Sequence, residues 1–382
     1  MTVPIRIARA EVTPYSVTLP RPLKSAAGCW DTRSGALLRL TDEDGRYGVG
    51  EACPLPGMSA ETAAEATAAL TDVAARLDGR SFDGDVYIHH LTSGAAPDDV
   101  YVHRDEALAG LGDVCIHHLP ASAQFALESA MADLAGQVSG LPVAAMLAGG
   151  RTLGRRVPVC GLIGLAGDED DRHAQACALV ERGFSTLKIK ITGDHLADDL
   201  AVVRRIRTSF PDLGIRVDAN GSLGIASARE ALIELASLTV EMVEDPVPAH
   251  AMASLAPSPV ALAVDLSREG DGPAMLPNAL LAPWMRAPDL AAVVVKPARI
   301  GGLGRTLAIA REAESRGVHT IVSHLLDGPV AMAAYAALAS QFSGPACGLG
   351  PHPGLLPWTA SVPHHRGPFI DPSPAPGLGV AW

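Results

Sequence analysis

Two lysines in one short apolar segment are the first residues of this sequence that call for a chemical explanation. Lys188 and Lys190 lie in segment 185–191, where they alternate with apolar and β-branched residues. Side chains in a β-strand repeat every two residues, so both ammonium groups point to the same face. Neighbouring like charges are unfavourable on a buried strand. The segment is therefore either an exposed edge strand or part of a site that uses the two charges.

The rest of the chain favours a site, because further strand-like segments follow and most of them end in a charged residue. These ends are Asp218, Glu244, Asp265 and Lys296. Counted from Lys190, consecutive charged ends are 21 to 31 residues apart. A (β/α)₈ barrel of about 250 residues repeats a strand and a helix every ~30 residues, and its active site lies where the strands end. We therefore predict that three carboxylates and three lysines meet at one mouth of a barrel.

The three carboxylates predict a metal site. Carboxylates a few ångströms apart repel one another, and some would take up protons unless a cation were bound. Hard oxygen ligands suit Mg²⁺, and the absence of His or Cys at these strand ends argues against zinc. We predict that Asp218, Glu244 and Asp265 bind Mg²⁺, for which Mn²⁺ is the expected substitute.

The lysines predict a general base. Nearby positive charge favours the neutral amine, and a neutral lysine is a competent base near pH 7. Lys190 is closer to the carboxyl end of its strand than Lys188, so we assign Lys190 as the base and Lys188 as the group that tunes it. Lys296 would face the substrate from the other side. This set suits abstraction of a proton α to a carboxylate, with the metal holding the enediolate that forms.

These residues need a particular arrangement of strands and helices. The predicted barrel strands are 157–162, 185–191, 215–218, 240–244, 261–265, 291–296, 319–323 and 346–349. The plainest helices between them are 170–182, 195–209, 225–237, 303–316 and 329–341. Ahead of the barrel we predict strands in 3–19 and 36–52, a hairpin turn at 41–45, a loop at 21–31, a helix that begins at Ser59 and one over 122–138. The chain is thus an α/β protein in which a barrel follows a smaller domain.

Composition limits the classes of function. The net charge of −12 argues against nucleic acid or an anionic membrane as a partner, and no apolar run is long enough to span a bilayer. The six cysteines are scattered without a C-x-x-C pair, and no signal peptide is visible, so we expect reduced thiols in a cytoplasmic protein. Two histidine pairs, at 89–90 and 117–118, lie in the poorly readable region 80–120. They fit a solvated insertion better than a metal site, because no other ligand pattern accompanies them.

The charged residues also sit in recognisable motifs. Lys188-x-Lys190, Asp218-Ala-Asn220, Glu244-Asp-Pro246, Asp265 and Lys296-Pro-x-x-x-Gly-Gly302 together resemble the enolase superfamily, in its muconate-lactonizing subgroup. The resemblance spans nearly the whole chain. It implies a modified TIM barrel, (β/α)₇β, with an α+β capping domain. It gives the divisions 1–121 for the cap, 122–352 for the barrel and 353–382 for a tail that returns to the cap.

The candidate substrate contacts are Trp30, Asn220, Ser323 and His324. For Trp30 the alternative is a place in the core between the domains, and for His324 it is a solvated loop. Within the subgroup, segments 48–62 and 126–134 and Gly348-Leu-Gly350 are most similar to o-succinylbenzoate synthases. The departure nearest the metal is Leu266-Ser267 after Asp265, where the family usually has Glu-Ser. The support of that ligand is therefore expected to differ.

The reaction implied is syn dehydration of 2-succinyl-6-hydroxy-2,4-cyclohexadiene-1-carboxylate to o-succinylbenzoate, a step toward menaquinone. Lys190 would remove the α-proton and return it to the departing hydroxyl. Lys296 would lie over the ring as a cation–π contact. The partner would be this small carboxylate, and the sequence does not indicate the oligomeric state.

Other reactions share these residues. N-acylamino acid racemisation would use Lys190 and Lys296 as opposed bases, and muconate-type cycloisomerisation stays open. Dipeptide epimerases of the subgroup tend to carry Asp-x-Asp where this chain has Gly348-Leu-Gly350, so they fit less well. An alternative of another class is a non-catalytic relative that binds an acid. Stabilisation by Mg²⁺ would distinguish an enzyme from that relative.

Overall fold

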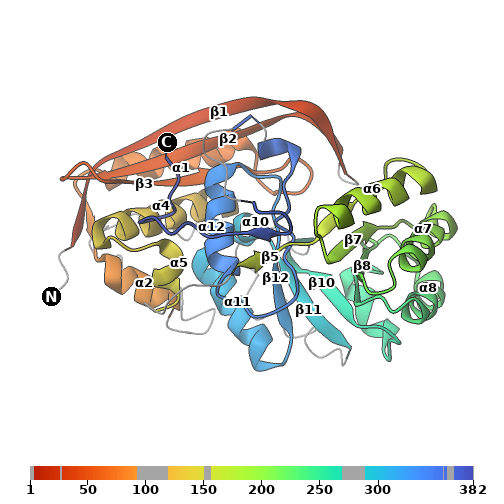
Figure 1. Ribbon diagram of the computed structural model, residues 1–382. Coiled ribbons are helices and arrows are strands. Elements are labelled where there is room, and N and C mark those ends of the chain that lie inside the picture. The colour runs from red at the N-terminus through yellow and green to blue at the C-terminus, as the bar shows by residue number, and fades with distance from the viewer. Residues whose placement is uncertain are drawn as a thin grey trace.

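The computed structural model describes residues 4–25, 28–92, 119–149, 156–268, 289–355, 357–358 and 365–381. Figure 1 shows two parts, an antiparallel sheet with its helices and a curled parallel sheet surrounded by helices. The long β1–β2 ribbon, red to orange in Figure 1, runs along one side of the molecule and ends near α6. This architecture confirms the predicted modified barrel with a cap. No helix in these ranges is long and apolar enough to cross a membrane.

The antiparallel sheet has four strands in the order β3-β2-β1-β4. They are β1 (Ile5–Ser25), β2 (Gly28–Asp42), β3 (Tyr47–Ala52) and β4 (Ser81–Phe82). The turn between β2 and β3 is the predicted one, because the Asp42 carboxylate accepts the backbone N–H groups of Asp44 and Arg46. A local side-chain acceptor of this kind is what makes Asp a turn residue.

The loop predicted over 21–31 is wrong. β1 and β2 keep pairing to the end of their hairpin, where Leu23 lies opposite Trp30 and Ser25 opposite Gly28. Pro20 and Pro22 are unfavourable in a regular strand, because proline has no N–H for a strand ladder. Both prolines fall within the register shift between Thr18 and Leu23, and such an irregularity tolerates them.

The first helix, α1 (Ala63–Leu77), begins four residues after the predicted start at Ser59. Thr62 forms a capping box with Glu65, in which each side chain accepts a backbone N–H from the other residue. Ser59 lacks an acidic partner three residues on, and its hydroxyl accepts the Leu55 N–H instead. The short helix α2 (Gly84–Thr92) carries His89, whereas His117 and His118 lie outside the described residues.

Helix α4 (Ala121–Ser139) lies against the antiparallel sheet and is buried along most of its length. Two glycines of β3 make this contact possible. A Cβ atom on Gly48 would stand 2.3 Å from the Ala130 carbonyl oxygen, and one on Gly50 would stand 1.7 Å from the Ala126 carbonyl oxygen. No side chain fits at such distances, so the Gly-Val-Gly sequence sets how closely strand and helix approach.

The parallel sheet contains seven strands in consecutive order. They are β6 (Gly161–Ile163), β7 (Thr186–Lys190), β8 (Gly214–Asp218), β9 (Met242–Glu244), β10 (Leu262–Asp265), β11 (Leu290–Val295) and β12 (His319–Val322). The helices are α6 (Glu169–Glu181), α7 (Leu196–Ser209), α8 (Ile225–Ser237), α10 (Pro297–Ile300), α11 (Leu303–Ser315) and α12 (Pro329–Ala339). The strands and the five predicted helices lie within a few residues of the predicted positions. A 3₁₀ segment, η3 (Ala249–Leu255), stands between β9 and β10, where the repeat is shortest.

The barrel closes where the eighth strand was predicted, although only single bridges form there. Cys347 bridges Val159 and Gly348 bridges Ser323, both in parallel sense. The predicted first strand is divided. Its beginning, β5 (Val157–Pro158), pairs with β13 (Phe369–Ile370) from the tail, and only β6 joins the barrel sheet.

The tail beyond β13 reaches helix α4 and the short helix α5 (Val143–Leu147). The buried Asp133 of α4 accepts the N–H of Val49 from β3 and the N–H of Leu378 from the tail, each at 2.8 Å. Burial raises the pKa of Asp133 to about 6, although these hydrogen bonds oppose the shift. Asp133 therefore joins β3, α4 and the tail. The division of the chain into domains at residues 121 and 352 stays a prediction.

Candidate active site

The strand register brings the predicted charged residues to one edge of the parallel sheet. Lys190 at the end of β7 pairs with Asp218 at the end of β8, and Asp218 pairs with Glu244 at the end of β9. Asp265 ends β10 and Lys296 directly follows β11. The three carboxylates are buried. All of these side chains lie at the carboxyl ends of their strands, where barrel active sites are found.

The lysines of β7 bind the same carboxylate. Lys188 Nζ lies 2.7 Å from both Asp218 Oδ2 and Glu244 Oε2. Lys190 Nζ lies 2.5 Å from Asp218 Oδ2 and donates to Asn220 Oδ1 at 2.8 Å. The N–H of Asn220 donates to Asp218 Oδ1, and the left-handed φ of 48° at Asn220 turns the chain back over that strand end. Of the predicted substrate contacts, Asn220 is thus the one that touches Lys190.

The two lysines differ in their electrostatic surroundings. Burial would lower the pKa of Lys188, but the Asp218 and Glu244 carboxylates reverse this and raise the pKa well above its ordinary value. The pKa of Lys190 is lowered, because burial and the neighbouring Lys188 outweigh the attraction of Asp218. Lys188 is therefore held as a cation, and Lys190 loses its proton more readily; its role as the base stays a prediction.

The carboxylates that converge most closely are not quite the predicted set. Among the residues that the structure places, Glu244, Asp245 and Asp265 form the group whose ligand atoms all lie within 4.8 Å of one another. Asp218 lies outside this group and holds the two lysines of β7. Sequence reasoning missed Asp245, although it directly follows Glu244. The left-handed φ of 41° at Asp245 marks the tight backbone turn there.

This donor set fits a hard divalent cation. It offers only carboxylate oxygens, which suit Mg²⁺. Burial raises the pKa of Glu244 and of Asp245, and repulsion from neighbouring carboxylates adds to both shifts. A cation would relieve that repulsion. Ser267 orients the Asp265 carboxylate, because its hydroxyl and its N–H donate to Asp265 Oδ1 at 2.5 and 3.0 Å. Asp265 also forms an ion pair with Lys296.

The other predicted substrate contacts lie in different settings. His324 is half-buried. Burial lowers its pKa to about 3, and its ring packs against His352 with the centroids 4.3 Å apart and the ring planes tilted by 36°. Its Nδ1 accepts the Leu326 N–H, so it could meet a substrate carboxylate only as a neutral donor. Ser323 donates to the Gly348 carbonyl across the barrel closure at 3.3 Å. Trp30 is half-buried in the β1–β2 hairpin, and its role stays a prediction.

A buried polar cluster joins the antiparallel sheet to the barrel. Arg33 of β2 donates to the backbone carbonyls of Cys53 and Pro54 on one side and of Leu326 on the other. Glu51 of β3 accepts the Tyr15 hydroxyl at 2.5 Å and the Ala331 N–H, in the first turn of α12, at 2.9 Å. This cluster fixes the cap against the segment that carries His324.

The Glu51 carboxyl gives this junction a dependence on pH. Burial raises its pKa from 4.5 to about 7, against the hydrogen bonds from Ala331 and Tyr15. A carboxyl with a raised folded-state pKa binds more protons when folded, so its stabilising effect is complete below pH 4.5 and is lost as the pH rises through 7. We expect the free energy of unfolding to fall between about pH 5 and pH 7, with Glu51 contributing on the order of 2 kcal/mol.

Urea unfolding at several pH values measures this effect. Glu51→Gln should flatten the slope, and the exposed Glu314→Gln of α11 is the matched control that should leave it unchanged. Identical slopes for Glu51→Gln and the wild type would show that Glu51 does not titrate in this range.

Comparison with known proteins agrees with this geometry. Residues 171–382 match the family model described as enolase C-terminal domain-like, and residues 9–85 match the MenC N-terminal domain. The L-Ala-D/L-Glu epimerase of Bacillus subtilis is 29% identical over 343 residues, which cover 88% of this chain and 86% of that protein. The o-succinylbenzoate synthase of Desulfotalea psychrophila is also 29% identical, over 344 residues that cover 83% and 85%.

A solved structure agrees at the level of the fold. A dipeptide epimerase from Enterococcus faecalis, complexed with Mg and the dipeptide L-Leu-L-Tyr, aligns with a TM-score of 0.74 at 20% identity and covers 99% of this chain and 100% of that one. The relatives are thus divided between lyases and epimerases. The barrel match spans more than half of the sequence. The chain therefore belongs to the enolase superfamily.

Proposed function

We propose that this protein is a Mg²⁺-dependent lyase that removes the proton α to a carboxylate and eliminates water, acting as an o-succinylbenzoate synthase. The observation that carries the proposal is the placement of two lysines about one carboxylate cluster. Lys190 ends β7 and Lys296 follows β11, and three strands of the sheet separate them. A planar carboxylate substrate bound at the cluster would have one lysine on each face.

Each residue then has a defined task. Asp218 and Asn220 hold the amine of Lys190 at the barrel mouth, where it takes the α-proton. Lys188 stays between Asp218 and Glu244 and adds positive charge beside the reacting carboxylate. Glu244, Asp245 and Asp265 are the residues that would hold the metal, with Asp218 as the further candidate that the sequence predicted. Bound Mg²⁺ would supply positive charge to the substrate carboxylate as its proton leaves.

The dehydration needs only one base. Lys190 would receive the α-proton and then pass it to the departing hydroxyl on the same face, so that water leaves and the ring becomes aromatic. Lys296 would lie over the other face of the ring as a cation–π contact. Its ion pair with Asp265 supports this cationic role.

The end of the eighth strand supports a lyase over a dipeptide epimerase. A dipeptide presents an ammonium group, which needs a carboxylate partner, and this chain has Gly348 and Gly350 where such epimerases tend to carry two Asp. A Cβ atom at Gly348 would stand 2.6 Å from the Ser323 hydroxyl, so the site has no room for a larger side chain without rearrangement.

The first test follows the ultraviolet absorbance of the cyclohexadiene carboxylate with the purified protein and Mg²⁺. We expect rapid loss that stops when Mg²⁺ is chelated. A wild-type protein that leaves this substrate unchanged, yet exchanges the α-proton of N-acylamino acids in D₂O, would replace the lyase with a racemase. The opposed pair Lys190 and Lys296 favours that second candidate over muconate-type cycloisomerisation.

Thermal unfolding with and without Mg²⁺ separates both enzymes from the non-catalytic alternative. We expect Mg²⁺ to raise the melting temperature, because it binds the folded state alone. A protein that neither gains stability from Mg²⁺ nor turns over either substrate would be an acid-binding relative.

A further inference from the structure

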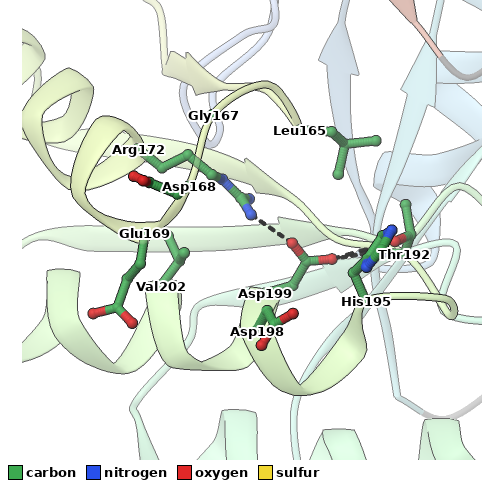
Figure 2. A pocket seen from close by; sticks show the side chains of 10 residues that line it. All are labelled: Leu165, Gly167, Asp168, Glu169, Arg172, Thr192, His195, Asp198, Asp199 and Val202. Atoms are coloured by element: carbon green, nitrogen blue, oxygen red, sulfur yellow. Dashed lines mark hydrogen bonds and ion pairs between the residues drawn. The ribbon is translucent and has the colours of Figure 1, made fainter.

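A buried ion pair lies beside the proposed base, outside the ligand cluster. Arg172 and Asp199 are each the fourth residue of their helix, α6 and α7, and each is 3% exposed. Figure 2 shows Arg172 reaching from α6 to Asp199 on α7, at a cavity of about 450 Å³ that Thr192 and His195 also line. The two helices precede and follow β7, so the pair meets over the end of the strand that carries Lys190.

The pair holds the backbone groups on either side of one residue, Ile191. Arg172 Nη1 lies 2.5 Å from Asp199 Oδ1, and Arg172 Nη2 donates to the carbonyl oxygen of Lys190 at 2.5 Å. Asp199 Oδ2 accepts the N–H of Thr192 at 2.7 Å. Arg172 therefore donates to the Lys190 carbonyl, and Asp199 accepts the Thr192 N–H. These two backbone groups lie on the same edge of the strand.

These groups would otherwise have lost their partners. The ladder between β6 and β7 ends where Ile163 pairs with Ile189, and the chain of β6 then turns away. On the opposite edge the strand is still paired, because the Ile191 N–H donates to the Asp218 carbonyl. Backbone groups alternate between the two edges, so the Lys190 carbonyl and the Thr192 N–H face the side that β6 has left. The side chains of Arg172 and Asp199 form the hydrogen bonds there that a neighbouring strand would otherwise form.

Stability alone is a poor reason for such a pair. Removing two charges from water is expensive, and apolar side chains of similar volume often stabilise a protein as well or better. The Nε of Arg172 has no hydrogen-bond partner among the residues that the structure places, which adds to the cost. An apolar pair would fill the same space, but it could not orient the peptide that follows Lys190.

We propose that Arg172 and Asp199 are positioning residues, which replace the missing strand edge and so fix the direction in which Lys190 presents its amine. The inference rests on the proposed role of Lys190 as the base. Neither side chain touches the substrate in this scheme. A displacement of about 1 Å in a reacting group lowers a rate by ~10²-fold, so loss of the pair is expected to lower kcat more than it changes KM.

The test compares two arginines that bridge the same helices. Arg172→Met removes the proposed device and keeps the aliphatic stem. Arg205 of α7 pairs with Glu169 and Asp170 of α6 at the exposed surface, so Arg205→Met is the matched control that loses a helix–helix ion pair without touching β7. We expect Arg172→Met to lower kcat about 10- to 100-fold with KM and Mg²⁺ affinity within about twofold, and Arg205→Met to resemble the wild type.

A second readout does not depend on turnover. Amide hydrogen exchange of the peptide over residues 186–193 should be faster in Arg172→Met than in the wild type or Arg205→Met. Arg172→Lys keeps one charged donor and should restore part of kcat and part of the protection. If Arg172→Met does not fold, Asp199→Asn serves as the second variant in both measurements.

The outcomes separate the two proposals. Wild-type kcat in folded Arg172→Met, while Lys190→Ala is inactive, would overturn the positioning role and keep the base. Equal losses in Arg172→Met and Arg205→Met would overturn it as well, since helix bridging alone would then explain the effect. If the wild type turns over no substrate, or Lys190→Ala retains activity, the proposed function fails. The exchange rates of peptide 186–193 then decide whether the pair holds the strand end.

Discussion

Replacing Lys190 with alanine is expected to lower the rate of α-proton exchange by about 10²- to 10⁴-fold, the range that a positioned general base contributes. Lys190 ends β7 with its amine 2.5 Å from Asp218 and 2.8 Å from Asn220, at the strand edge where the carboxylates gather. Alanine removes the amine and leaves the strand and the carboxylates in place. Proton NMR in D₂O, with Mg²⁺ and the substrate that the wild type turns over, measures the exchange directly.

Lys190→Arg is the informative companion to this variant. It keeps a positive charge of similar reach, but a guanidinium is not deprotonated in proteins. If Lys190 acts as a base, the arginine variant loses exchange as completely as the alanine variant. Exchange that survives in Lys190→Arg would mean that position 190 contributes only its charge. Exchange that survives in both variants would move the base to another residue.

The second large effect is expected on metal binding. Asp265→Asn should weaken Mg²⁺ binding by at least about 10- to 100-fold, because it removes a formal charge from a buried set of oxygen ligands. The Asp265 carboxylate is 2% exposed, and Ser267 holds one of its oxygens through two hydrogen bonds. Isothermal titration with MgCl₂ measures the change. Asp289→Asn is the matched control, since Asp289 precedes β11 and accepts the Ser258 N–H away from the cluster.

The same titration decides between two ligand sets. Asp218→Asn should weaken Mg²⁺ binding if the sequence-based set is right, and Asp245→Asn should do so if the set that converges in the structure is right. Either result is compatible with Asp265 as a ligand. Unchanged affinity in Asp265→Asn would remove it from both sets and leave its ion pair with Lys296 as its role.

The sequence predicts the barrel well because its signal is periodic. Apolar strands that end in a charge recur at near-regular intervals, so the pattern alone places Lys190, Asp218, Glu244, Asp265 and Lys296 at strand ends. The capping sheet carries no such period. The loop predicted over 21–31 is a paired hairpin, because Pro20 and Pro22 fall in a register shift that depends on both strands.

Contacts within the site were less accessible to sequence reasoning. Asp245 follows Glu244 directly, and strand alternation would turn it to the other face, but its left-handed backbone brings it back to the cluster. Arg172 and Asp199 are 27 residues apart and belong to no recognised motif. They come together only because both follow strands that are neighbours in the barrel, and that pairing is a property of the fold.

The contacts of Asp133 bear on the order in which a ribosome could complete this protein. Its carboxylate binds Val49, which is made early, and Leu378, which lies 245 residues further along the chain than Asp133 itself. The cap strands leave the ribosome first. The Leu378 N–H, which donates to Asp133 of α4, is missing until the tail has emerged. The cap therefore reaches its final packing only after the barrel has been translated. Nascent chains arrested before residue 378 should remain more sensitive to protease within the cap than chains released in full, and equal resistance would contradict this order.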